Sequence, residues 1–133
     1  IHPEAYESYV YMAQLYTDTK RPDSLESLYA LSKRVGTEWE RIGTAIGYSM
    51  RRLGNNARAE QMLKEVLTRA PRHEPAYKTL VQMYYGAARY DSLLGIMERW
   101  ASMNPADVQT KELLDSVRVL VRNQSTAPPP DNP

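Results

Sequence analysis

The side chains that most often carry catalysis or bind metals are few in this chain and widely separated. The two histidines, His2 and His73, lack the i, i+4 spacing and third ligand expected of a helical zinc site. The segment Gly43–Gly47 has two glycines but not the lysine or the preceding strand of a phosphate loop, so close helix packing explains it better. Asp and Glu residues are spread along the chain, and no acid–base pair is predicted. We therefore expect a protein that is not an enzyme and uses no metal or cofactor.

The composition narrows the function classes further. The 133 residues fit one domain, and the net charge of +1 argues against a general nucleic-acid or membrane-surface binder. The absence of cysteine excludes disulfides and thiolate zinc sites. No apolar run approaches the roughly 18 residues that span a bilayer. Because the chain begins at Ile1, we expect a soluble segment of a longer protein, and the compartment, cytoplasmic or periplasmic, stays open.

The elements that must position any functional side chain are predicted to be helices in a repeating arrangement. One pattern begins at Tyr6, Glu40 and Glu74, with steps of 34 residues and no gap. This period is typical of helix–turn–helix units that bury their apolar faces by stacking on one another. Turn residues divide the chain into seven helical segments of roughly 13 to 17 residues, and no strand pattern is present. The predicted fold class is all-α.

Several helix ends have a local cause in the sequence. Pro22 suits a first helical turn, and Gly54 suits a left-handed helix stop followed by an Asn cap at position 55 or 56. The run 104–107 predicts a cap, a proline and a first-turn acid for the last helix. We expect repeats at about 6–39, 40–73 and 74–107, a capping helix at about 105–122 within a domain of 1–122, and a disordered tail at 123–133.

The aligned repeats carry a recurrent set of aromatic and small residues. The first has Tyr9, Met12, Ala13, Tyr16, Leu25 and Tyr29; the second has Ile46, Gly47, Gly54, Ala59, Leu63 and Pro71; the third has Tyr77, Leu80, Tyr84, Tyr90, Asp91 and Pro105. In this the chain resembles the tetratricopeptide repeat (TPR) family. The resemblance implies a right-handed superhelical α-solenoid of three antiparallel helix pairs with a seventh, capping helix. One departure is Gly43, where the family has a large aromatic residue, and Trp39 is expected to fill that space.

The resemblance also implies where a partner binds, because the first helix of each pair lines a groove in this family. Carried over by position, the first repeat presents an acidic end and the other two present a basic and aromatic surface suited to a peptide with carboxylates. The acidic end comprises Glu7, Val10, Gln14, Thr17 and Asp18. The predicted partner-binding groove comprises Arg41, Thr44, Tyr48, Arg51, Arg52, Lys78, Gln82 and Tyr85.

The leading hypothesis is a non-catalytic scaffold that binds a protein or peptide, with self-association through an open end as a variant. One subclass of the family clamps C-terminal carboxylates with cationic and amide side chains, and this clamp is absent because its positions hold Val10, Gln14, Ala45, Pro75 and Thr79. The alternative is a soluble C-terminal appendage of a larger enzyme or membrane protein whose activity lies elsewhere. RNA binding is a third class, and the balanced charge argues against it. No membrane insertion is expected.

Overall fold

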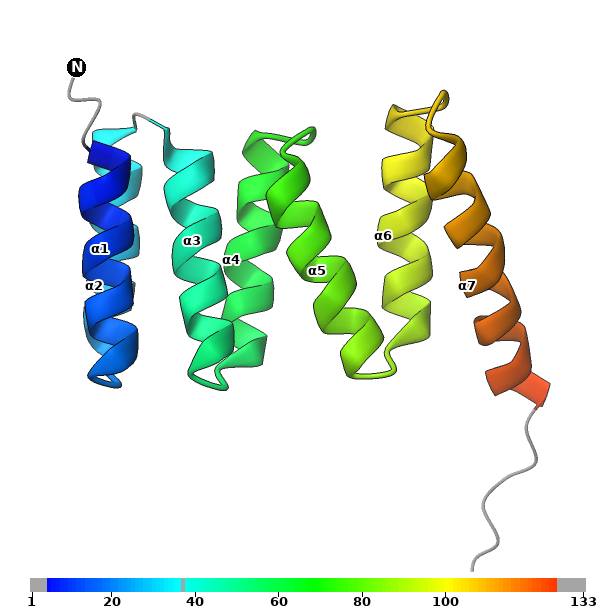
Figure 1. The fold of residues 1–133 in the computed structure, drawn as a ribbon, viewed down its shortest axis with the longest axis horizontal. Helices are drawn as coiled ribbons and strands as arrows, with labels where there is room; N and C mark the ends of the chain where they lie inside the picture. The colour runs from blue at the N-terminus through cyan, green and yellow to red at the C-terminus, as the bar shows by residue number, and fades with distance from the viewer. Residues whose placement is uncertain (1–4, 37, 127–133) are drawn as a thin grey trace, which may run out of the picture. The chain divides into compact units, whose positions relative to one another are not determined.

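The computed structural model describes residues 5–36 and 38–126, and this part of the chain contains seven helices and no strand (Figure 1). The predicted all-α class is confirmed, and the arrangement is consistent with a helical-repeat solenoid. The helices are α1 (Ala5–Asp18), α2 (Pro22–Val35), α3 (Trp39–Arg52), α4 (Asn56–Arg69), α5 (Glu74–Gly86), α6 (Tyr90–Met103) and α7 (Val108–Thr126).

The 34-residue period is present in the backbone as well as in the sequence. Helices α2, α4 and α6 begin at Pro22, Asn56 and Tyr90, at intervals of 34 residues. The turn before each of them contains a residue with positive φ: Lys20 at 54°, Gly54 at 83° and Ala88 at 55°. In each turn the next residue's N–H donates to a carbonyl in the last turn of the preceding helix, as from Asn55 N to Met50 O at 3.0 Å. The three turns therefore repeat one helix-ending geometry.

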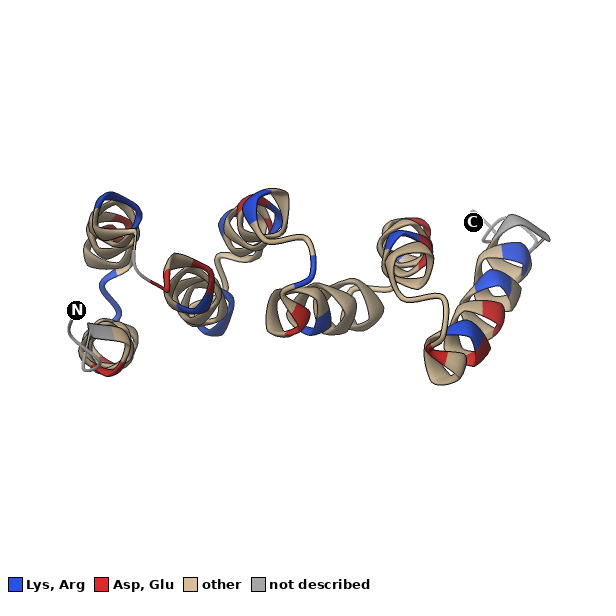
Figure 2. Cartoon of the chain, turned by 90° about the horizontal axis from the view of Figure 1, so that it is seen from above, with Lys and Arg blue, Asp and Glu red and all other residues tan. Residues whose placement is uncertain are grey.

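The first compact unit, residues 1–79, contains α1 to α4 and the start of α5. Helices α1 and α3 form one row and α2 and α4 the other, with α3 packed against all three (Figure 2). Apolar residues of α4 recur at i, i+3, i+4 and i+7, so one stripe faces the core. Complete burial of each large side chain contributes about 1.5–3 kcal/mol. The fully buried core side chains include Leu25, Ile42, Ile46, Met62, Leu63 and Val66.

Two glycines of α3 allow this close packing. A Cβ at Gly47 would lie 3.1 Å from Cγ of Leu63, so a side chain there would press into α4. A Cβ at Gly43 would lie 2.9 Å from Cγ2 of Val66 and 3.5 Å from the Trp39 ring. Trp39 is buried, so the expectation that it fills the space beside Gly43 is confirmed.

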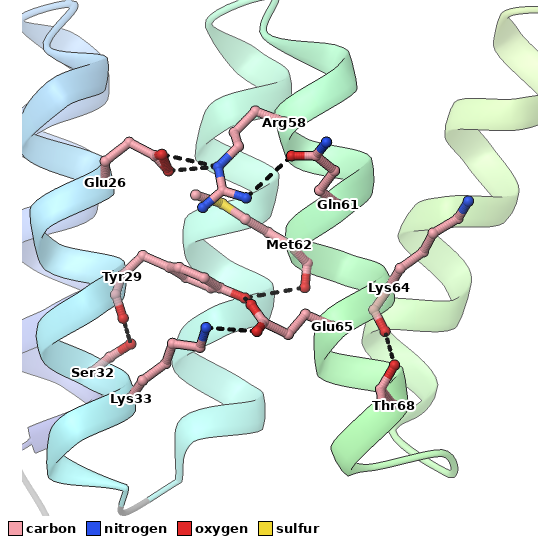
Figure 3. A network of polar contacts seen from close by, with 10 residues as sticks. All are labelled: Glu26, Tyr29, Ser32, Lys33, Arg58, Gln61, Met62, Lys64, Glu65 and Thr68. Carbon is pink, nitrogen blue, oxygen red and sulfur yellow. Dashed lines mark hydrogen bonds and ion pairs between the residues drawn. The ribbon is translucent and has the colours of Figure 1, made fainter.

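Polar contacts join the second helices of the first two repeats (Figure 3). The Tyr29 hydroxyl and the Lys33 ammonium of α2 each donate to the Glu65 carboxylate of α4 at 2.6 Å. Nearer the N-terminal ends of the same two helices, Arg58 Nε of α4 donates to the Glu26 carboxylate of α2 at 2.7 Å. These pairs are 32 to 36 residues apart in the chain, so they hold one repeat against the next.

The second compact unit, residues 80–133, contains the rest of α5 together with α6 and α7, which pack against each other. Its buried side chains include Leu80, Tyr84, Leu93, Met97, Trp100, Leu114 and Val117.

Three local predictions need correction. The last helix begins at Val108, because the Asp107 carboxylate caps it by accepting from Thr110 N at 3.1 Å; Asn104 instead follows α6 and donates to Trp100 O at 3.0 Å. Helix α7 continues to Thr126, so residues 123–126 of the predicted tail are helical, and 127–133 lie outside the described residues. Asn55 stands before α4, but its amide contacts Sδ of Met50 at 3.7 Å instead of capping the helix.

Candidate functional site

A pocket of about 330 Å³ lies along α3 within the first unit. Its lining residues come from α1, from α3, from the turn before α5 and from the first half of α5. These are the first helices of the three predicted repeats, which are the helices predicted to line the groove. We call it the α3 pocket. Its lining residues are Tyr6, Arg41, Thr44, Ala45, Tyr48, His73, Pro75 and Thr79.

Arg41 is the cationic group of the α3 pocket. Its guanidinium carbon lies 3.8 Å from the centre of the Tyr6 ring, and its Nη1 donates to Glu38 Oε1 at 2.6 Å. The hydrogen bond to Glu38 raises the pKa of Arg41, so the charge persists across the physiological range. A guanidinium has five N–H donors in a planar fork. Arg41 is thus held in place by a ring and a carboxylate while keeping donors for a further acceptor.

Tyr48 and Thr44 line the pocket beside Arg41 and differ in how accessible their side chains are. Tyr48 is about half exposed, so its ring can cover an incoming apolar side chain at low entropic cost. Thr44 is buried, and its hydroxyl donates to the Glu40 carbonyl at 2.7 Å. Thr17, predicted for the acidic end, is likewise buried and donates to Ala13 O at 2.6 Å. Both threonine hydroxyls are thus used within their own helices.

His73 stands in the turn before α5, where its N–H donates to Ala70 O at 3.0 Å. Its Nε2 is buried and has no hydrogen-bond partner among the described residues. Burial lowers the pKa of His73; nearby Glu40 opposes the shift and Arg41 adds to it. Burial therefore favours the neutral form of the imidazole.

The other predicted groove residues do not line the α3 pocket. Arg52 donates to Gln14 Oε1 at 3.2 Å, and Arg51 is half-buried one residue before it. Lys78 pairs with Glu74 of its own helix at 2.7 Å. Gln82 and Tyr85 belong to the second unit, where the Tyr85 ring lies 6.3 Å from that of Tyr90. The structure thus gathers Arg41, Thr44 and Tyr48 around one pocket out of the eight predicted residues.

Several pocket residues were not predicted to bind a partner. Ala45, Pro75 and Thr79 were noted only as positions that lack a carboxylate clamp, yet all three line the α3 pocket. Ala45 and Thr79 are 34 residues apart, so they occupy the same position in successive repeats. The repeat register would therefore have placed both on the same side of the row of first helices. Tyr6 is the first residue of the first predicted repeat, and His73 is the last residue of the second. No sequence signal links either residue to Arg41.

Within residues 5–36 and 38–126, no group of three His, Cys, Asp or Glu side chains could hold a metal ion. No helix in the described part of the chain is both long and apolar enough to cross a membrane. The α3 pocket combines two tyrosine rings, small apolar residues and one cation.

Comparison with protein-family models, curated proteins and solved structures finds no match for this chain.

Proposed function

We propose that this chain is a TPR-like protein–protein interaction module without catalytic activity, which binds a peptide segment of a partner along α1, α3 and the start of α5. The periodic helix starts and the recurring left-handed turns support the repeat class. The observation that carries the binding proposal is the α3 pocket, where Arg41 is fixed between Tyr6 and Glu38 beside the exposed Tyr48 ring.

The pocket also defines the expected ligand. An apolar or aromatic side chain fits between Tyr48 and the small residues Ala45 and Pro75, and a neighbouring carboxylate pairs with Arg41. Such an extended acidic peptide gains affinity from one buried anchor and one charge-assisted hydrogen bond.

A random-peptide display library selected on the full chain tests the proposal, followed by calorimetric titration of the enriched peptides. We expect acidic peptides with an apolar anchor, and at least a tenfold weaker dissociation constant for Tyr48→Ala and for Arg41→Glu. Lys64→Glu, a charge reversal on an exposed residue of α4, is the matched control and should leave affinity unchanged. Enriched peptides that bind the pocket variants as tightly as the original chain would refute the proposal.

A further inference from the structure

A second pocket, of about 410 Å³, lies next to the α3 pocket within the first unit. It is formed by the first turn of α3 and by the turn that joins α4 to α5. We call it the turn pocket, and its lining residues are Glu40, Ala70, Pro71, Arg72 and His73. Because His73 lines both pockets, a peptide that leaves the α3 pocket over this residue enters the turn pocket.

Two successive residues of α3 belong to different pockets and carry opposite charges. Arg41 lines the α3 pocket and stacks on Tyr6 of α1, whereas Glu40 lines the turn pocket. Successive side chains of a helix point about 100° apart, because one turn contains 3.6 residues. Burial lowers the pKa of His73, and the charges of Glu40 and Arg41 act on that pKa in opposite directions. Both charges therefore lie near the residue that the two pockets share.

The Glu40 carboxylate gives the turn pocket its binding preference. Glu40 is half-buried, and no hydrogen bond or ion pair joins its side chain to another residue within the described ranges 5–36 and 38–126. A carboxylate that loses part of its hydration without gaining a partner is unfavourable, so a ligand that supplies a cation is favoured. The other charged residue of the pocket, Arg72, is exposed, and solvent screens its charge more strongly.

The rest of the lining suits the stem of a long basic side chain. Ala70 and Pro71 contribute small apolar surfaces to the same pocket as the carboxylate. Lysine and arginine lay their methylene stems along apolar surface while the charged head reaches a polar group. In the turn pocket the stem can lie on Ala70 and Pro71 while the head donates a charge-assisted hydrogen bond to Glu40.

We propose that the turn pocket is a second subsite for the peptide bound in the α3 pocket, and that Glu40 selects a lysine or arginine of that peptide. The inference rests on the proposed peptide-binding function and adds the charge order of the ligand, which is an acidic residue at Arg41 and a basic residue at Glu40. An extended chain advances about 3.3–3.6 Å per residue, so the basic residue should lie within roughly four residues of the acidic one.

A peptide display library with a fixed leucine–aspartate core and random flanking residues tests this charge order. It is selected in parallel on the full chain and on its Glu40→Lys and Glu40→Gln variants. On the original chain we expect lysine or arginine to be enriched at one position near the core aspartate. That position should become acidic on Glu40→Lys and lose its charge preference on Glu40→Gln. The matched control is Glu112→Lys, the same exchange at an exposed residue of α7, which should select the same peptides as the original chain.

Calorimetric titration of one enriched peptide and of its lysine-to-glutamate counterpart measures the effect. The counterpart should bind the original chain roughly tenfold more weakly, and should bind Glu40→Lys more tightly than the enriched peptide does. Peptides that keep the acidic core but show no basic preference would overturn the second subsite and leave the α3 pocket as proposed. An acidic preference that disappears in Arg72→Gln would also overturn it, because Arg72 would then select the residue. If no chain enriched any peptide, this inference and the proposed function would both be wrong.

Discussion

Replacing Ala88 by glycine should stabilise this protein, although the same exchange destabilises a helix. Ala88 has φ of 55°, in the left-handed region, within the turn between α5 and α6. An L-residue there costs roughly 1–2 kcal/mol, whereas glycine adopts this conformation freely. The greater freedom of glycine in the unfolded chain offsets about 0.5–1 kcal/mol of that gain. We therefore expect Ala88→Gly to raise the free energy of unfolding, by up to about 1.5 kcal/mol.

Two matched variants separate the cost of the left-handed backbone conformation from the other effects of exchanging alanine and glycine. Ala30→Gly makes the same chemical change at an exposed position inside α2, and should lower the free energy of unfolding by about 1 kcal/mol. Gly54→Ala introduces the strained alanine at the equivalent turn, where φ is 83°, and should also destabilise.

Urea denaturation of the three variants and the original chain, followed by circular dichroism, measures these differences. The reasoning predicts opposite signs for the two Ala→Gly exchanges. A loss of stability in Ala88→Gly comparable to that in Ala30→Gly would refute it, because the turn would then carry no strain.

Three further predictions concern packing and pH. Gly47→Leu should lower the melting temperature sharply, because its Cβ would already lie 3.1 Å from Leu63 Cγ, and an unaltered melting temperature would contradict both the packing and the register. Burial raises the pKa of Glu65, but hydrogen bonds from Lys33 and Tyr29 outweigh it and hold the folded pKa below its usual value. Its stabilisation is therefore present above the unfolded pKa of about 4.3 and lost as pH falls through the folded pKa; Glu65→Gln should flatten this acid limb in urea titrations at several pH values. Burial lowers the folded pKa of His73, so the folded state should lose stability as pH falls below about 6.5, and a His73→Gln variant with the same slope there would contradict this.

The strongest sequence signals were those that repeat or that act over a few residues. The 34-residue period predicted helices whose starts recur at that interval, and Gly36 and Gly54 have the positive φ that helix-ending glycines adopt. Turn residues predicted all three equivalent turns, but the residue type indicated the positive φ only at Gly54, because Lys20 and Ala88 are not residues that favour positive φ. The register alone would have located both. A recurring turn is thus better predicted from its spacing than from its residue type.

The site was harder to predict, because its parts come from helices far apart in the chain. Arg41 and Tyr48 followed from their position in the repeat, but the stacking of Arg41 on Tyr6 joins residues of α1 and α3. Thr44 has the right position for a groove, yet its hydroxyl bonds to its own helix. Position in a repeat indicates which way a residue points, but not which neighbour satisfies its polar atoms.

The sequence by itself determined the helical class, the period and most helix boundaries, because periodic apolar residues and turn residues act within one or two helical turns. Only the tertiary structure decided which side chains meet. The ion pair between Lys33 and Glu65 and the α3 pocket both depend on how successive helices pack. Burial and hydrogen bonding between repeats are properties of surfaces brought together in space, and linear spacing constrains them only through the register.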